Sequence, residues 1–136
     1  MIIADTSGLL AFFSESGRYH ESVVEWLERN NPVIVVSPFV IAEIDYLVAT
    51  RKGVEAELAV IRELAGGAYE LPMMNPDDLA LACEVVERYR NLGIGITDAS
   101  LVVLADRYHT RTILTLDRKH FGVVRPLDGS HFEIVP

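Results

Sequence analysis

The stretch that decides the fold is MIIADTSGLLAFF at residues 1–13, where an apolar run stops at Asp5 and resumes after Gly8. Residues 2–4 are typical of a short buried strand, and residues 9–13 of a helix that follows it. A carboxylate between two buried elements is either a cap on the second element or a functional group at the edge of a sheet. The remaining strand ends of the chain bear on that choice.

Short β-type runs alternate with helical patterns along the whole chain. This alternation favours an α/β fold with a central, mostly parallel sheet covered on both faces. The run VIVV at residues 33–36 has no polar interruption, as expected of an interior parallel strand. We expect further strands at 68–71, 112–116 and near 132–135, and further helices at 20–29, 38–50, between 53 and 66, 76–89 and 97–108. No repeat or linker marks a second domain, so we expect one domain over residues 1–136.

The bulk composition predicts a soluble protein in the cytoplasm. Half of the residues are hydrophobic, yet no apolar run approaches the roughly 18 residues that would span a membrane. The N-terminus also lacks the basic region and cleavage site of a signal peptide. The single cysteine, Cys83, has no partner, which fits a reducing compartment and excludes a multi-cysteine metal site. We expect Cys83 to be a core or helix-face residue.

The charge of the chain is negative but unevenly distributed. The net charge of −8 argues against a surface that coats nucleic acid in general. Residues 1–100 carry 7 basic and 16 acidic side chains, whereas residues 101–136 carry 5 basic and 4 acidic ones. A polyanionic ligand is therefore expected to approach from the C-terminal part of the chain.

Four acidic residues are expected to meet at one edge of the sheet. If the strands that end before Asp5, Ser37 and Asp117 are parallel neighbours, their carboxyl ends share the edge where open α/β sheets bind ligands. A helix beginning after Ser37 starts from that edge, and Glu43 lies about 9 Å along it. The helix beginning at Thr97 runs back toward the last of these strands, so Asp98 in its first turn lies at the same edge.

Helical phase supports Asp98 more clearly than Glu43. Asp98 shares a face with apolar residues at i+3, i+4 and i+7, although capping of the helix would also explain an aspartate there. On the earlier helix, Glu43 and Asp45 flank the apolar stripe about equally, and Glu43 has the bulkier neighbours. We therefore expect Glu43 to be the more enclosed of the two.

Four unpaired carboxylates at one edge require a cation. Together they would repel one another and raise one another's pKa values. Mg²⁺ and Mn²⁺ prefer oxygen ligands and commonly use one or two carboxylates, several waters and a substrate phosphate. Such a site activates a bound water for hydrolysis of a phosphodiester.

The chain resembles the PIN-domain ribonucleases, in particular the VapC-type toxins of bacterial toxin–antitoxin pairs. The matching pieces are ADTSGLLAFF around Asp5, SPFVIAEIDYL around Glu43, GIGITDASLVVLA around Asp98 and ILTLDRKHF around Asp117. They occur in the family's order over positions 4–121. The resemblance implies a PIN-like α/β/α sandwich and RNA cleavage that depends on Mg²⁺ or Mn²⁺.

The resemblance also implies roles for individual residues. Asp5, Glu43, Asp98 and Asp117 would form a catalytic, metal-binding acidic quartet, with Asp5 and Asp98 as the direct metal ligands and Asp117 tuning metal occupancy. Thr6 or Ser7 would hydrogen-bond the first aspartate or the scissile phosphate. Thr97 and Thr115 would support the carboxylates, although each is equally well explained as a cap or a strand residue. Apart from the resemblance, the basic residues that flank the strand expected at 112–116 are candidate contacts to RNA phosphates; these are Arg111, Arg118 and Lys119.

The partners that the resemblance implies are an RNA substrate, a second copy of the chain and a cognate antitoxin. The C-terminal segment of the antitoxin would cover the acidic cleft and insert an arginine as a competing cation. A DNA-binding domain would belong to the antitoxin, so this chain would meet DNA only through the complex.

Other classes of protein also gather carboxylates at a sheet edge. A receiver-type signalling domain needs an acidic pair after its first strand, where this chain has Thr6 and Ser7. A haloacid-dehalogenase-type phosphatase needs a second aspartate two residues after the first, which is also Ser7 here. A PIN-like domain that only binds would be expected to lack one of the four carboxylates, and none is missing.

Overall fold

Five parallel strands form one sheet in the computed structural model, which describes residues 1–136. The strands are β1 (Ile2–Ala4), β2 (Ile34–Val36), β3 (Tyr69–Glu70), β4 (Thr112–Leu114) and β5 (Glu133–Val135). Their order is β3-β2-β1-β4-β5, with Ile3 of β1 in register with Val35 of β2 and Ile113 of β4. The three strands expected to be neighbours are adjacent, so their carboxyl ends share one edge of the sheet.

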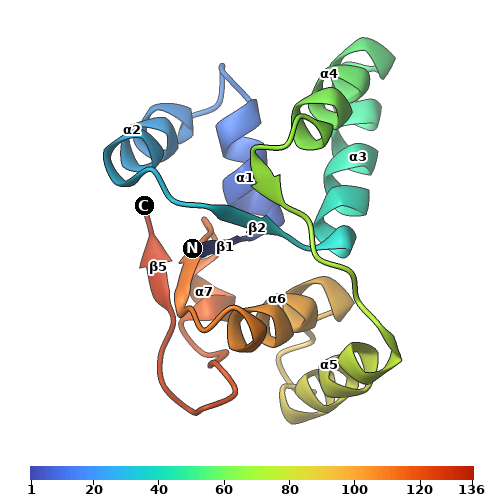
Figure 1. The fold of residues 1–136 in the computed structure, drawn as a ribbon, viewed down its shortest axis with the longest axis vertical. Helices are drawn as coiled ribbons and strands as arrows, with labels where there is room; N and C mark the ends of the chain where they lie inside the picture. Colours follow the sequence, from blue (N-terminus) through green and yellow to red (C-terminus); the bar gives the residue numbers. More distant parts are fainter.

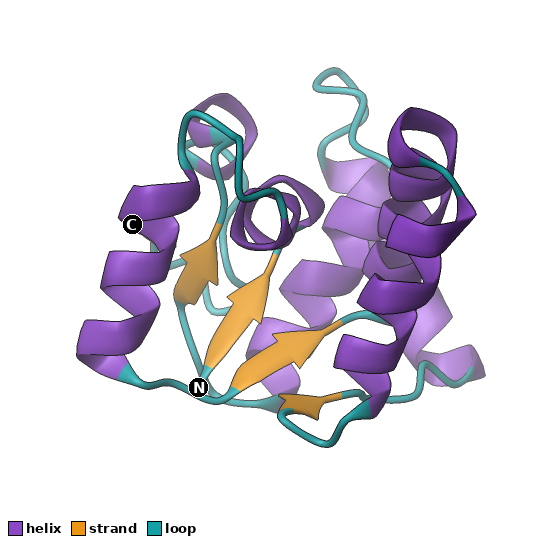
Figure 2. Ribbon diagram, turned by 90° about the horizontal axis from the view of Figure 1, so that it is seen from above, coloured by secondary structure: helices purple, strands orange, loops and turns teal.

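Helices cover both faces of this sheet, as an α/β sandwich requires. They are α1 (Thr6–Phe13), α2 (His20–Asn30), α3 (Pro38–Lys52), α4 (Val54–Ala65), α5 (Pro76–Arg88), α6 (Ile96–Arg107) and α7 (Arg118–Phe121). Figure 1 shows α1 to α4 on one side of the strands and α5 and α6 on the other. In Figure 2 the strand arrows point broadly the same way, in keeping with the parallel pairing. None of the helices combines the length and the apolar composition needed to cross a membrane.

The central strands are apolar because both of their faces are buried. Ile3, Val35 and Ile113 are fully buried, and all three are β-branched residues that suit a pleated surface. They belong to one hydrophobic cluster of 28 buried residues, to which α6 contributes an almost continuous run from Ala99 to Ala105. A single core therefore joins the sheet to the helices that carry the acidic residues.

Gly8 allows α1 to begin directly against the end of β4. A Cβ atom at this position would overlap the carbonyl oxygen of Leu114, so no larger residue fits without a shift of the backbone. The same carbonyl accepts the N–H of Asp5 at 2.9 Å. The close approach brings the first turn of α1 within reach of the residues that follow β4.

Several predicted boundaries were wrong by one to three residues. The second strand begins at Ile34 rather than residue 33, and the fourth ends at Leu114 rather than at residue 116. The helix expected over residues 97–108 begins at Ile96, and its N-cap is Gly95 rather than Thr97. Thr97 therefore lies within the first turn, where its hydroxyl is available to another element.

The C-terminal part of the chain contains one helix that the sequence analysis missed. The short helix α7 follows β4, and Asp117 is its N-cap: its side chain accepts the N–H of His120 at 2.9 Å. Four residues are too few to show a helical period in the sequence. Cys83 is exposed on α5, so the helix-face alternative holds and the core alternative was wrong.

Candidate active site

Asp5 lies at the carboxyl end of β1, in the middle of the sheet edge, and is 6% exposed. One carboxylate oxygen, Oδ1, accepts the N–H of Thr6 at 2.8 Å, so Asp5 does cap α1. The other, Oδ2, accepts the hydroxyls of Thr115 at 2.7 Å and Ser7 at 2.9 Å. Burial raises the pKa of Asp5, and these hydrogen bonds only partly oppose that effect. The cap and the site interpretations of Asp5 are therefore compatible.

The two hydroxyl groups that hold Asp5 are themselves held by the main chain after β4. The N–H of Leu116 donates to Ser7 Oγ at 3.0 Å, and the N–H of Asp117 donates to Thr115 Oγ1 at 2.9 Å. Each hydroxyl therefore accepts a backbone proton while directing its own proton to the Asp5 carboxylate. This arrangement fixes Asp5 relative to β4 and to the residues that lead to Asp117.

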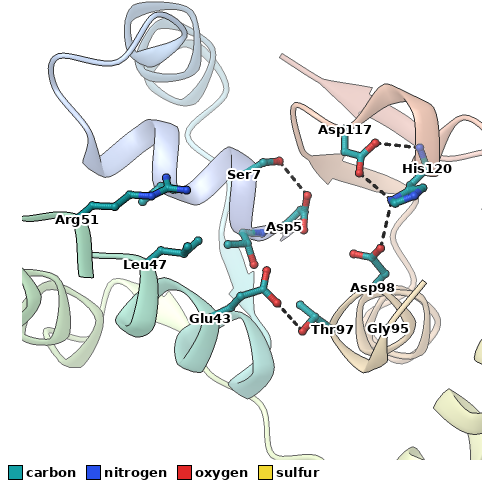
Figure 3. A pocket seen from close by; sticks show the side chains of 12 residues that line it. Asp5, Ser7, Glu43, Leu47, Arg51, Gly95, Thr97, Asp98, Asp117 and His120 are labelled. Carbon is teal, nitrogen blue, oxygen red and sulfur yellow. Dashed lines mark hydrogen bonds and ion pairs between the residues drawn. The ribbon is translucent and has the colours of Figure 1, made fainter. Parts of the chain in front are cut away.

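Asp98 and Glu43 approach the same space from α6 and α3. The Asp98 side chain is 20% exposed in the first turn of α6, whereas Glu43 is exposed on α3. Thr97 donates its hydroxyl to Glu43 Oε2 at 2.9 Å, which ties the two helices together (Figure 3). The expectation that Glu43 is more enclosed than Asp45 was wrong, yet it is Glu43 that lines the cavity.

A buried pair of serines fixes the distance between α3 and α6. Ser37, the N-cap of α3, lies 2.8 Å from Ser100 of α6, and both residues are fully buried. Ser100 donates its only hydroxyl proton to the carbonyl of Thr97 at 2.6 Å, so Ser37 is the donor in the pair. The pair holds together the two helices that carry Glu43 and Asp98.

His120 lies between the carboxylates of Asp117 and Asp98. Its Nδ1 lies 2.9 Å from Asp117 Oδ2 and 3.6 Å from Asp98 Oδ2. Figure 3 shows the ring between the two carboxylates, with Asp117 also held by the main chain of α7. Nothing in the sequence marks His120 as a site residue except its position three residues after a possible N-cap, Asp117.

The electrostatics of Asp98 show that the carboxylates act on one another. Burial, followed by the charge of Asp5, raises the pKa of Asp98 from 3.8 to about 6. Asp117 and Glu43 add to the rise, and His120 opposes it. A cation beside Asp98 would relieve this repulsion.

The four carboxylates surround one cavity of about 520 Å³. Its lining includes Asp5, Thr6, Ser7, Glu43, Arg51, Thr97, Asp98, Asp117 and His120. Arg51, in the last turn of α3, is the one arginine or lysine among the lining residues, and the sequence analysis did not single it out. Thr115 supports Asp5 from behind rather than lining the cavity.

The donors in this cavity suit a partly hydrated divalent cation. No three acidic or histidine side chains are placed to enclose an ion by themselves. Mg²⁺ does not need such a cage, because it keeps several waters and binds through one or two carboxylates and a substrate phosphate. Thr6 Oγ1 is the one buried side-chain polar atom without a hydrogen-bond partner. A buried orphan hydroxyl beside the carboxylates is expected where a water or a phosphate oxygen binds.

The basic residues expected to contact RNA lie in two different places. Arg118 and Lys119 are exposed on α7, next to Asp117 but outside the lining of the acidic cavity. Arg111 precedes β4 and lines a separate cavity with Asp106 and Asp128. Because Arg111 is at the amino end of its strand, it lies at the opposite edge of the sheet from the carboxylates.

Comparison with known proteins identifies the family. The sequence matches the PIN domain over residues 2–125, nearly the whole chain. The chain belongs to the PIN-domain family. Ribonuclease VapC26 of Mycobacterium tuberculosis is 55% identical to it over 115 residues, which cover 85% of each sequence. Within the PIN-domain family, the chain therefore groups with the VapC ribonucleases, and the expected resemblance is confirmed.

Solved structures of PIN-domain proteins confirm the fold. VapC20 of Mycobacterium tuberculosis, described as a sarcin-ricin loop cleaving toxin, superposes with a TM-score of 0.82 at 19% identity over the full length of both chains. The DNA-bound VapBC complex of Salmonella typhimurium gives a TM-score of 0.73 at 14% identity over 98% of each chain. At these identities the likeness establishes a shared PIN-domain fold.

Proposed function

We propose that this chain is the toxin of a toxin–antitoxin pair and hydrolyses RNA phosphodiester bonds with Mg²⁺ or Mn²⁺, as a single domain over residues 1–136. The observation that carries the proposal is the group of four carboxylates around one cavity, beside the orphan hydroxyl of Thr6. Its relationship to a VapC ribonuclease at 55% identity supports the reaction class. PIN-domain membership argues against the receiver and phosphatase alternatives.

In this proposal the four carboxylates have two different roles. Asp5 and Asp98 hold the cation, since both are largely enclosed and the charge of Asp5 acts on Asp98. Glu43 and Asp117, which are more exposed, adjust how firmly it is held. When bound, the cation lowers the pKa of a water and stabilises the oxygen that leaves phosphorus.

Other residues of the chain position the reacting groups. Ser7 and Thr115 keep the Asp5 carboxylate in one orientation through their hydroxyl protons. The free hydroxyl of Thr6 can donate to an oxygen of the scissile phosphate, and His120 holds Asp117 toward Asp98. Arg51 is placed to contact a phosphate on the opposite side of the cavity from His120 (Figure 3).

The partners in this proposal follow from the charge of the cavity and from the structural relatives. Solved relatives include toxin–antitoxin complexes from Salmonella typhimurium, bound to DNA, and from Klebsiella pneumoniae. For this chain we propose a homodimer and a cognate antitoxin whose C-terminal segment covers the acidic cavity. An antitoxin arginine among the four carboxylates would take the place of the metal cation. Contact with DNA would then be made by the antitoxin.

The chemistry of the product ends tests the proposed hydrolysis. Attack by water cannot form a 2′,3′-cyclic phosphate, whereas attack by the neighbouring 2′-hydroxyl must form one first. We expect the purified chain, freed of any partner and supplied with Mg²⁺, to cut RNA without cyclic phosphate ends. Mass spectrometry of the fragments would measure this, with an inactive variant purified in parallel as a control for contaminating ribonuclease. Cyclic ends produced by the wild type alone would contradict the proposal.

A further inference from the structure

A second cavity opens at the same edge of the sheet, next to the acidic one. It has a volume of about 350 Å³ and is lined by Tyr19, Ser22, Thr115, Leu116, Arg118 and Pro136. The start of α2 and the end of β5 therefore lie side by side, in keeping with the position of the C-terminus beside α2 in Figure 1. None of the functional roles proposed above uses this cavity.

The chain that follows β4 separates the two cavities. Asp117 lines the acidic cavity, whereas its neighbours Leu116 and Arg118 line the second one. Thr115 also lines the second cavity, while its hydroxyl donates to Asp5 at 2.7 Å. A ligand in the second cavity would therefore contact the two sequence neighbours of Asp117, beside the proposed cleavage site.

The second cavity is lined by a basic side chain, whereas the first is lined mainly by carboxylates. No acidic side chain lines it, and Arg118 reaches it from α7. One guanidinium nitrogen of Arg118 donates to a main-chain oxygen of Pro136 at 3.2 Å, which leaves its other N–H groups for a ligand. Outside the cavity, Arg18 lies over the Tyr19 ring, 5.4 Å from its centre. Arg118 and Arg18 are thus two basic groups beside the carboxylates, in a chain with a net charge of −8.

Tyr19 supplies the second half of a nucleotide-binding surface. Tyr19 is a large aromatic residue that lines the cavity, yet it is 46% exposed and so accessible to a ligand. Unpaired RNA bases stack on such rings, and an arginine fork matches the geometry of a phosphate. An aromatic ring and an arginine with unused N–H groups in one cavity thus fit a nucleoside phosphate.

We propose that the Tyr19–Arg118 cavity binds the nucleotide that flanks the scissile phosphate, with its base against Tyr19 and its phosphate on Arg118. This inference rests on the proposed function, because it names the part of the RNA substrate that this edge of the sheet holds. It places a contact with an RNA base next to the proposed site of phosphodiester cleavage. Selection of the cleavage position would then depend partly on an unpaired base at that point.

An abasic scan of the RNA tests the base contact. The protein is the full chain carrying Asp98→Asn, which prevents turnover, and the probe is a fluorescent single-stranded oligoribonucleotide in Mg²⁺. One abasic residue is moved along the probe, and the dissociation constant is measured by anisotropy. We expect one position at which loss of the base weakens binding about 10-fold. Adding Tyr19→Leu should weaken binding of the intact probe by a similar factor and abolish the abasic effect, whereas adding Tyr19→Phe should preserve both.

Two further variants make the scan specific. Tyr46→Leu removes an exposed tyrosine that lies outside this cavity, and it should leave binding and the abasic effect unchanged. Arg118→Gln should weaken binding of every probe about equally, because a phosphate contact does not depend on the base. An abasic effect that persists in Tyr19→Leu, or equal binding by the Arg118→Gln protein and its parent, would overturn the inference. Failure of the proposed function is a separate result, namely no RNA cleavage by the wild type.

Discussion

Asp98→Asn is expected to reduce RNA cleavage by a factor of about 1000 or more. The amide has nearly the shape of the carboxylate but carries no charge, so it cannot balance a divalent cation beside a side chain that is only 20% exposed. The first-order rate of cleavage of a defined RNA, measured with enzyme in excess, would give this factor directly.

Asp5→Asn is expected to have a similar effect for an additional reason. Asp5 Oδ2 accepts two hydroxyl protons, from Thr115 at 2.7 Å and Ser7 at 2.9 Å. An amide nitrogen in that place would face two donors, whereas an amide oxygen there would turn the nitrogen toward the N–H of Thr6. Either orientation disturbs the network that aligns this residue.

Asp106→Asn is the matched control for both substitutions. Asp106 is an exposed carboxylate at the far end of α6, outside the acidic cavity, so its variant removes the same charge without touching the site. We expect it to cleave at the rate of the wild type. Full activity of Asp5→Asn or Asp98→Asn would refute the proposed roles of these residues.

The stability of the metal-free chain is expected to fall as the pH rises from about 4 to about 6. The pKa of Asp98 is raised from 3.8 to about 6 by burial, by Asp5 and by the other carboxylates. The unfolded chain therefore loses this proton at a lower pH than the folded chain, and deprotonation of Asp98 opposes folding. The stabilisation by the protonated group is complete below about pH 4 and is lost through about pH 6. The difference in the free energy of unfolding is about 2–3 kcal/mol.

Asp98→Asn isolates this effect, because the amide cannot ionise. Denaturant unfolding of both proteins in EDTA, between pH 4 and pH 8, would measure their difference in stability. We expect the free energy of unfolding of the variant, relative to that of the wild type, to increase between pH 4 and pH 6 and to stay constant above that range. A difference that does not change with pH would contradict the account of Asp98. The same experiment shows that loss of activity in this variant is not a loss of folding.

The sequence predicted the meeting of Asp5, Glu43, Asp98 and Asp117 because strand order alone brings them together. Parallel neighbours place their carboxyl ends at one edge, and β1, β2 and β4 are neighbours in the sheet. The phase argument for Asp98 was less informative than it first looked, since α6 is buried on nearly all sides from Ala99 to Ala105. Position in the topology, rather than helical phase, carried the prediction.

His120 and Arg51 were missed for different physical reasons. His120 faces Asp98 because α7 turns the chain back after Asp117, and a helix of four residues has no period to detect. Arg51 reaches the cavity from the last turn of α3, where basic residues are common because they complement the helix dipole. The buried contact between Ser37 and Ser100 joins residues 63 positions apart, so no local pattern indicates it.

Dependence on a divalent cation is the most direct test of the acidic cavity. The purified chain, freed of any partner, would be stripped with EDTA, and RNA cleavage would then be measured as Mg²⁺ or Mn²⁺ is restored. We expect no cleavage after stripping and a saturable return of activity with either ion, because the proposed hydrolysis needs the cation to activate the attacking water and to stabilise the leaving oxygen. Cleavage that continues at an undiminished rate in EDTA would contradict the account.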